Sequence, residues 1–578
     1  MQDRKKALKI VALFISQLVI LLVMIISNQL VYATNDDTTI VSLASGAYGS
    51  PTEYIINMHY FIGCILKFLF RIMPTINWVT VLFISLLLWS FLLIDCMVVK
   101  IGILWDSIVA KGLIVDILFI MCTGYFSFTV VAYVAVMVGI LAFLLNDSVK
   151  KNKGVLLQAF GLLMFGLMVR GEVAKSLVIV ALPIIFLKSK DKINKKTIVV
   201  ILTTVVLMFA LEKTNFYLVN LNETQKNFLE WGETRSKALD CKAVPYNEEI
   251  FDKVGISAPQ YNAIYNAFYY AYETIDLDVM QEIIALNSLQ NKYNFDIMGF
   301  VENHFSFLQN VVSFDNMHKV IFYILIIFYF LLGNKKQRYF IAFTWLMVLG
   351  TEWIFFFINR ALYRVVMPNY VFAIVIMLLC CRIDKKYLDK LEVYSISKKK
   401  MVVTFGSILA IFAVYSKIAH CDYYQGWLYS NERQEVLAYM EENSEKIFLA
   451  GDARVFTIGV AESVWECPGQ EKGWNLIGNW ETYSLPYLEL MESHNISDPY
   501  NVLLEAIDNE DILLLTSFGK DFPKNYSWIL ELVEETYGLE VEFKKVDTIC
   551  TNKITEDIAE EYATYRLVRR ERDYGKEK

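Results

Sequence analysis

Long uninterrupted runs of apolar residues recur along this chain, and they constrain its fold more than any other feature. A hydrocarbon core of roughly 30 Å is crossed by about 20 helical residues. Several runs approach or reach that length, at 9–31, 76–98, 128–145 and 339–357. With 56% hydrophobic and 15% aromatic residues over 578 positions, the composition is typical of a polytopic membrane protein and not of an ordinary soluble one.

The sequence predicts about eleven transmembrane helices. The other predicted crossings lie at 112–126, 155–169, 176–187, 197–211, 320–332, 365–381 and 401–418. Lysine and arginine cluster in alternate loops, which assigns those loops to the cytoplasm. The first run is kept as an anchor because it is too long for a signal-peptide core and lacks a small-residue cleavage site. We therefore expect a multi-pass cell-membrane protein with a cytoplasmic N-terminus and an extracytoplasmic C-terminal domain.

Two acidic polar regions interrupt the apolar pattern. Residues 212–318 predict a helical outer loop, and residues 419–578 predict an α/β domain, with strands near 446–450, 511–515, 541–546 and 563–568. Residues 1–418 form the membrane module, whose first outer loop is 32–75. The expected fold class is a mainly α polytopic membrane protein with a C-terminal extracytoplasmic α/β domain. The placement of basic residues follows membrane topology and argues against nucleic-acid binding.

Adjacent carboxylates follow the first apolar run, at Asp36 and Asp37. A charge held against a bilayer is costly and suggests a functional site. One of the two is therefore a candidate general base or a ligand for a substrate hydroxyl, and the sequence does not choose between them. Acidic residues that cap a short helix are the structural alternative.

The second group of candidate functional residues consists of arginines. Arg360 and Arg364 lie in one short turn between two predicted crossings, and in a helix that spacing puts both on one face. Guanidinium groups suit bidentate phosphate binding, whereas contact with lipid headgroups is the structural alternative. Arg170 and Glu172 form a polar turn between two short apolar runs, where they either contact substrate or pair with each other.

Weaker candidates for substrate binding are His59, Tyr363 and Arg235. Glu352 and Asp95 lie within predicted crossings and are expected to be paired inside the bundle. An aromatic and amide cluster in the C-terminal region is interpreted as a packed core corner rather than a sugar site: Trp474, Asn475, Asn479, Trp480 and Tyr483. The nine cysteines show no CxxC spacing, so the sequence predicts no zinc site and selects no disulfide.

The predicted topology puts Asp36, Asp37 and the three arginines on one side of the membrane. A carboxylate base and a phosphate clamp together suit transfer from a phosphate leaving group to a hydroxyl. Outside the cytoplasm such a donor is expected to be lipid-linked, with its polyisoprenoid tail between helices and its phosphate near the arginines.

The acidic motif in the first outer loop, the following interface helix, the Arg-x-x-x-Arg-Val turn and the outer C-terminal domain resemble the GT-C glycosyltransferase superfamily. The motifs that carry this resemblance are residues 35–49 and 359–365, within a layout that spans about 1–418. The resemblance implies a polyprenyl-phosphate sugar donor, a base at Asp36 or Asp37, and phosphate binding by Arg360 or Arg364. It implies a cell-envelope glycan or glycolipid as acceptor.

Other functions fit parts of the same pattern. An envelope polysaccharide polymerase or ligase also combines many crossings with outer arginines. A lipid or polysaccharide transporter is less consistent, because the chain lacks an internal repeat and its polar turns lie near one face. A receptor whose C-terminal region binds a ligand is the non-enzymatic option. The sequence shows no cofactor signature and leaves a requirement for a divalent cation open.

Overall fold

The computed structural model describes the chain outside a set of internal and terminal segments. The residues outside the description are 1, 102–104, 146–152, 187–194, 240–243, 291–295, 312, 383–430, 453–454, 456–462, 468–474, 479–480, 554–558 and 571–578.

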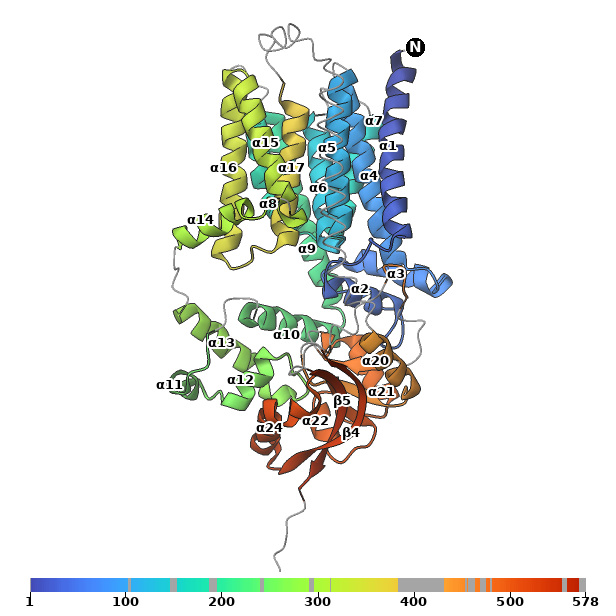
Figure 1. Cartoon of the computed structure of the whole chain (residues 1–578), viewed down its shortest axis with the longest axis vertical. Helices are drawn as coiled ribbons and strands as arrows, with labels where there is room; N and C mark the ends of the chain where they lie inside the picture. The colour runs from blue at the N-terminus through green and yellow to red at the C-terminus, as the bar shows by residue number, and fades with distance from the viewer. Residues whose placement is uncertain are drawn as a thin grey trace, which may run out of the picture.

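The molecule has two parts, a bundle of apolar helices and a polar lobe at the end of the bundle opposite the N-terminus (Figure 1). The bundle is formed by α1 (Gln2–Ile26), α4 (Trp78–Ile101), α5 (Trp105–Gly124), α6 (Phe128–Leu145), α7 (Lys153–Val169), α8 (Val173–Ala181) with the 3-10 helix η2 (Leu182–Phe186), α9 (Lys195–Val219), α15 (Met317–Leu332), α16 (Lys335–Phe357) and α17 (Tyr363–Cys380). We call the end of the bundle that faces the lobe its lobe end.

Seven helices of the described chain are long and apolar enough to cross a membrane. Their apolar spans are Arg4–Ile26, Trp78–Lys100, Phe128–Leu145, Ile198–Val219, Phe314–Leu332, Lys335–Phe357 and Tyr363–Cys380. The expected count of about eleven is not confirmed. Two of the predicted crossings are the shorter apolar helices Lys153–Val169 and Val173–Ile184, and the one at 401–418 lies outside the described residues.

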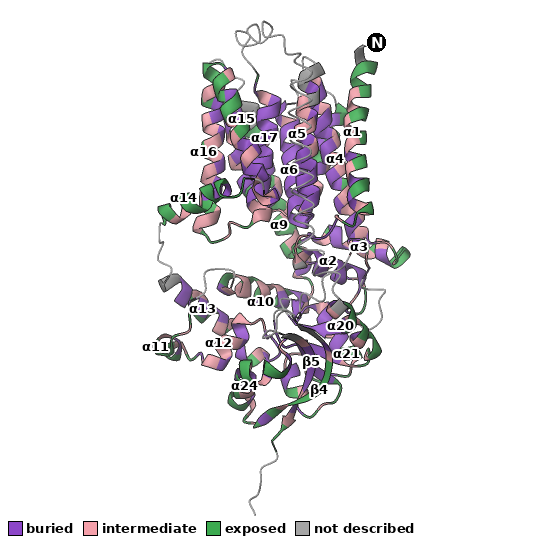
Figure 2. Cartoon of the chain, in the orientation of Figure 1, coloured by how far each residue is buried: buried purple, intermediate pink, exposed green. Residues whose placement is uncertain are grey.

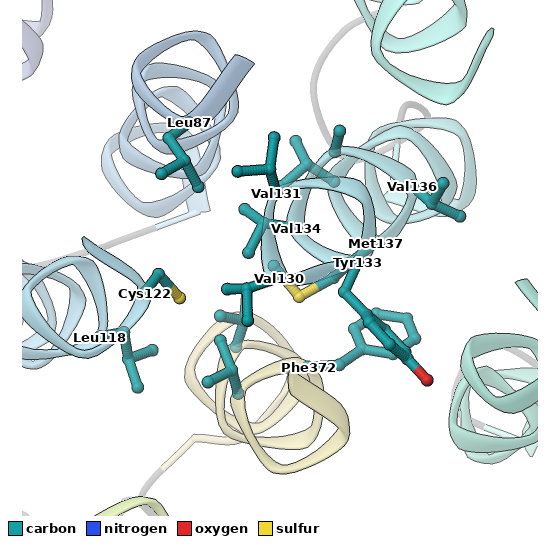
Figure 3. Packing of buried hydrophobic residues seen from close by; sticks show 14 of the residues in the cluster. Leu87, Leu118, Cys122, Val130, Val131, Tyr133, Val134, Val136, Met137 and Phe372 are labelled. Atoms are coloured by element: carbon teal, nitrogen blue, oxygen red, sulfur yellow. The ribbon is translucent and has the colours of Figure 1, made fainter. Parts of the chain in front are cut away.

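Helix α6 lies at the centre of the bundle. It is apolar on every side, as expected for a helix surrounded by other helices, and all its residues except Phe143 are buried. Figure 3 shows its side chains packed against Leu87, Leu118 and Phe372 of the surrounding helices. Gly139 allows α7 to approach closely, because a Cβ atom there would lie 2.9 Å from the carbonyl oxygen of Ala159. The peripheral helices, by contrast, have exposed residues on their outer sides (Figure 2), and these include apolar residues such as Leu22 and Leu202.

Two short helices connect α1 to α4 at the lobe end. Helix α2 (Asn35–Ser45) ends at Gly46, whose φ of 87° is the left-handed conformation that favours glycine. Helix α3 (Tyr60–Ile72) buries Ile62, Leu66 and Phe70 on one face. The interface helix expected after the acidic motif is α3, which begins at Tyr60 because His59 caps its start and residues 54–59 are not helical.

The lobe combines the long loop with the C-terminal region. The loop contributes α10 (Glu223–Leu239), α11 (Glu248–Phe251), α12 (Ala258–Tyr265) and α13 (Leu277–Gln290), and α14 (Ile297–Phe305) leads back to the bundle. The C-terminal region contributes α20 (Asn431–Glu442), α21 (Leu485–Ser493), α22 (Val502–Glu505), α23 (Phe522–Asn525), α24 (Trp528–Tyr537) and the strands β1 (Ile447–Ala450), β2 (Leu476–Ile477), β3 (Ile512–Thr516), β4 (Val541–Lys553) and β5 (Ala559–Arg569). We refer to residues 223–290 and 431–570 together as the lobe.

The described strands form one sheet in the order β2-β1-β3-β5-β4. Strands β2, β1 and β3 are parallel, with Leu449 opposite Leu514 in register, whereas β5 and β4 add antiparallel strands. The small α/β arrangement expected from the sequence is present in the C-terminal region, with the four predicted strands close to their expected positions.

The loop and the C-terminal region share one hydrophobic core. Trp231 and Tyr269 of the loop pack in a single buried cluster with Tyr483, Ile512 and other residues of the C-terminal region. The hydroxyl of Tyr270 donates to the carbonyl of Ile477 at 2.7 Å. The loop is therefore an integral part of the lobe rather than a separate cap above it.

Candidate functional site

The two acidic residues lie in the first turn of α2, at the lobe end of the bundle. The segment before the helix is fixed on the turn between α5 and α6, where the Ala33 amide donates to the Phe126 carbonyl at 2.9 Å. Negative charge is favourable at a helix N-terminus, so both acids suit their local position. Figure 1 shows α2 at the end of the bundle that faces the lobe.

Asp37 is buried and held by hydrogen bonds. It is 0% exposed, and its carboxylate accepts hydrogen bonds from the Thr34 hydroxyl and the Phe128 amide, each at 2.7 Å. Phe128 is the first residue of α6, so this carboxylate ties α2 to the N-terminus of the central helix. Burial raises the pKa of Asp37 to about 7, although its two hydrogen bonds favour the charged form and lower the pKa.

Asp36 points the other way and meets Arg364. Its Oδ2 atom lies 2.9 Å from Nη1 of Arg364, with the two side chains 21% and 18% exposed. Arg364 is the second residue of α17, so helix packing brings together groups that are far apart in the sequence. A half-buried carboxylate beside a guanidinium that still reaches solvent can exchange its partner for a ligand.

Arg170 lies near this pair, in the turn between α7 and α8. Its Nη1 atom donates to the Thr129 hydroxyl at 2.6 Å, and the guanidinium stacks 4.9 Å from the Phe128 ring centroid. The charges of Asp36 and Arg364 both act on it electrostatically. The charge of Glu172 also acts on Arg170, but the ion pair that Glu172 forms is an exposed one, with Lys175 at 3.2 Å.

Arg360 and Arg364 do not share a helix face. Helix α17 begins at Tyr363 after an extended residue, Leu362, so Arg360 lies before the helix. The Arg360 guanidinium is directed to α10, where Nη2 donates to the Ser236 hydroxyl at 3.4 Å. The sequence places both arginines on one face only if they share a helix, and this condition is not met, because Arg360 lies before the start of α17.

Tyr363 is packed beneath the site. Its ring contacts Tyr125 at 4.6 Å and His318 at 5.3 Å between centroids. The contacts place it among aromatic side chains of the bundle, where it supports the start of α17.

His59 has a structural position. It is buried, and its Nδ1 atom accepts a hydrogen bond from the Phe61 amide at the start of α3. Burial lowers the pKa of His59, so the ring is neutral. Arg235 lies on α10, with its guanidinium 6.0 Å from the Trp231 ring centroid.

Sequence reasoning missed Glu481, which comes from the lobe. It is buried, and its Oε1 atom accepts a hydrogen bond from Tyr48 at 3.4 Å, so the loop after α2 contacts the lobe. Burial raises the pKa of Glu481 to about 7, and the charges of Arg235 and Asp36 act on it. No sequence motif surrounds Glu481, and only the docking of Tyr48 reveals it.

Other sequence candidates are accounted for by packing. Glu352 is paired inside the bundle, as expected, with Lys319 at 2.8 Å. Asn475 and Tyr483 are buried in the lobe and bond to main-chain carbonyls, which fits a core corner. Trp474, Asn479 and Trp480 lie outside the described residues.

No metal cluster is present within the described part of the chain, where no three His, Cys, Asp or Glu residues are grouped to hold an ion. No protein-family model, curated protein or solved structure matches this sequence or fold.

Proposed function

We propose that this chain is an integral membrane glycosyltransferase that transfers a sugar from a polyprenyl-phosphate-linked donor to a cell-envelope glycan or glycolipid on the outer face. The observation that carries the proposal is the Asp36–Arg364 pair at 2.9 Å, positioned where the apolar bundle meets the polar lobe. A donor with an apolar tail and a charged phosphate fits this boundary, because the tail can lie against the apolar bundle while the phosphate stays in a polar environment.

Arg364 is the proposed phosphate ligand. A guanidinium binds carboxylate and phosphate with the same bidentate geometry, so an arriving donor phosphate competes with Asp36 for Arg364. Arg170 adds a second positive charge nearby. Positive charge that is already in position stabilises the negative charge that grows on the departing phosphate.

Asp36 is the proposed base. Once phosphate replaces it on Arg364, its carboxylate is available to take the proton of the acceptor hydroxyl. The acceptor oxygen forms a bond to the anomeric carbon, the bond from that carbon to the phosphate oxygen breaks, and polyprenyl phosphate leaves on Arg364. Asp37 positions this base through the α6 N-terminus and does not contact substrate.

The acceptor side of the site is proposed to include the lobe. Tyr48 and Glu481 join the loop after α2 to the lobe, and Arg235 and Arg360 lie on the same side. A buried carboxylate and nearby guanidiniums offer both acceptors and donors for sugar hydroxyls.

The test is binding of polyprenyl monophosphate to the full-length protein, measured by native mass spectrometry from detergent. Arg364→Gln should lose the lipid phosphate, while Asp36→Asn should bind it at least as well as the natural protein, because the competing carboxylate is gone. The Asp36→Asn variant should nevertheless fail to turn over donor. Glu510→Gln, at an exposed position of the lobe where the carboxylate pairs with Arg566, is the matched control.

Equal binding by the Arg364→Gln variant and the natural protein would contradict the phosphate assignment. Weaker binding by Asp36→Asn would contradict the exchange of partners at Arg364.

A further inference from the structure

Helix α14 buries its histidine and exposes most of its apolar residues, which is unusual for a helix in water. Its histidine, His304, is 2% exposed. Met298, by contrast, is 70% exposed and Ile297 61% exposed, and Val301, Phe305 and the following Leu308 are also exposed. A helix in water would bury these apolar side chains and expose the histidine.

Buried hydrogen bonds fix this orientation. His304 Nδ1 lies 2.7 Å from Oε2 of Glu352 on α16, and His304 Nε2 lies 2.5 Å from the Tyr323 hydroxyl on α15. Lys319 donates to the His304 carbonyl at 3.2 Å and pairs with Glu352 at 2.8 Å. The apolar face therefore points outward, since turning it inward would remove the His304 ring from the buried Glu352 carboxylate and the His304 carbonyl from the buried Lys319 ammonium.

The exposed apolar face continues the surface of the bundle. Helices α15 and α16 are candidate membrane spans, and they expose Ile327, Leu331 and Leu346 along their outer sides. Figure 1 shows α14 lying across the lobe ends of these helices, and Figure 2 shows its exposed residues on the outside of the molecule.

Asn303, an exposed polar residue of α14, lies on another side of the helix, because it is five residues from Met298 and therefore about 140° around the helix axis. Glu302, which is also exposed, is four residues from Met298 and lies about 40° from it, at the border between the apolar and polar sides. The helix thus has a buried side, an exposed apolar side and an exposed polar side. This is the pattern of a helix that lies in a membrane interface, with lipid on one side and water on the other.

We infer that the apolar face of α14, formed by Ile297, Met298, Val301, Phe305 and Leu308, contacts the acyl chains of the membrane leaflet on the lobe side. The long polar loop then re-enters the membrane surface before α15 begins. The interaction partner is lipid, and the buried His304–Glu352–Lys319 network holds the helix in that position. This inference does not depend on the proposed function.

The test uses the full-length protein reconstituted in vesicles that contain phosphatidylcholine with a diazirine on its acyl chain. After photolysis, labelled peptides are identified by mass spectrometry. The α14 peptide should be labelled as strongly as the peptides of α15 and α16, and Met298→Lys should lose this label. Asn303→Lys, on the polar side, should keep it, and α13 serves as the unlabelled reference.

Labelling of α14 no greater than that of α13 would overturn the inference. The same conclusion would follow if α14 were unlabelled but protected from hydrogen exchange in both detergent and vesicles, because a protein surface would then cover it. Since Met298→Lys could disturb the bundle, its thermal unfolding is compared with that of Asn303→Lys, and the labelling of the natural protein decides the question independently.

Discussion

Two carboxylate–cation pairs at the lobe end of the bundle, Glu352–Lys319 and Asp36–Arg364, differ in how many of their hydrogen-bonding groups have partners. Glu352 is 3% exposed and binds three partners, Lys319, His304 and the Tyr370 hydroxyl. Asp36 is 21% exposed and has Arg364 as its ion-pair partner among the described residues. The saturated pair holds helices together, while the half-exposed pair keeps capacity for a ligand.

Removing the saturated carboxylate should have the largest effect. Glu352→Ala leaves Lys319 buried without its counter-charge, which should lower the free energy of unfolding by about 3–5 kcal/mol. Thermal unfolding in detergent measures it. Glu172→Ala, which breaks an exposed ion pair, should change stability by less than about 1 kcal/mol. Equal stability of the two variants would mean that the buried network is not structural.

Removing the half-exposed carboxylate should affect turnover and not folding. Asp36→Asn should lower turnover of the lipid-linked donor at least about 100-fold, the smaller effect expected for loss of a general base. Its unfolding temperature should match that of the natural protein. Near-normal turnover would remove Asp36 from the reaction.

Asp37, the neighbour of Asp36, should make the stability of the protein depend on pH. Because the pKa of Asp37 is raised from 3.8 to about 7 in the folded protein, the folded state binds more protons than the unfolded state between these values. Stability should therefore fall as the pH rises from about 5 to 8, by about 2–3 kcal/mol from this group. Asp37→Asn, which mimics the protonated acid, should show a correspondingly flatter profile in detergent. A profile identical to that of the natural protein would contradict the raised pKa.

The smallest effect should come from a substitution at position 364 that keeps the positive charge but removes the planar guanidinium group. Arg364→Lys retains a cation but not the bidentate geometry, so affinity for polyprenyl monophosphate should fall about tenfold, as for one charge-assisted hydrogen bond of about 1.5 kcal/mol. The matched change Arg360→Lys should lower affinity less, because Arg360 is directed to Ser236. If Arg360→Lys lowered the affinity more than Arg364→Lys, the phosphate would instead be assigned to Arg360, which is directed to the lobe.

The positions of most helices could be predicted from the sequence, since apolar runs and basic loops determine them directly. The strands at 447–450 and 512–516 were also predictable from short buried runs. The packing of the lobe was not, because the residues that share its core, such as Trp231 and Tyr483, come from regions that lie before and after the bundle helices α15, α16 and α17. No local pattern records that pairing.

Most members of the candidate site were predictable, apart from Glu481, but their roles were not. The sequence marked Asp36, Asp37 and Arg364 as unusual for their position, but adjacent acids look alike until their neighbours are known. Burial against Phe128 distinguishes Asp37 from Asp36. The orientation of α14 was also out of reach, because the sequence does not show that His304 binds Glu352 and Tyr323 of other helices.

The shared core of the lobe has a consequence for biosynthesis. The aromatic residues of α10 and α12 emerge from the ribosome before α15, α16 and α17, and their packing partners in the C-terminal region, such as Tyr483, emerge after them. Until the C-terminal region is made, these residues lack those packing partners. A product that lacks the C-terminal region would therefore expose part of this core, and we expect chaperones and proteases to recognise it.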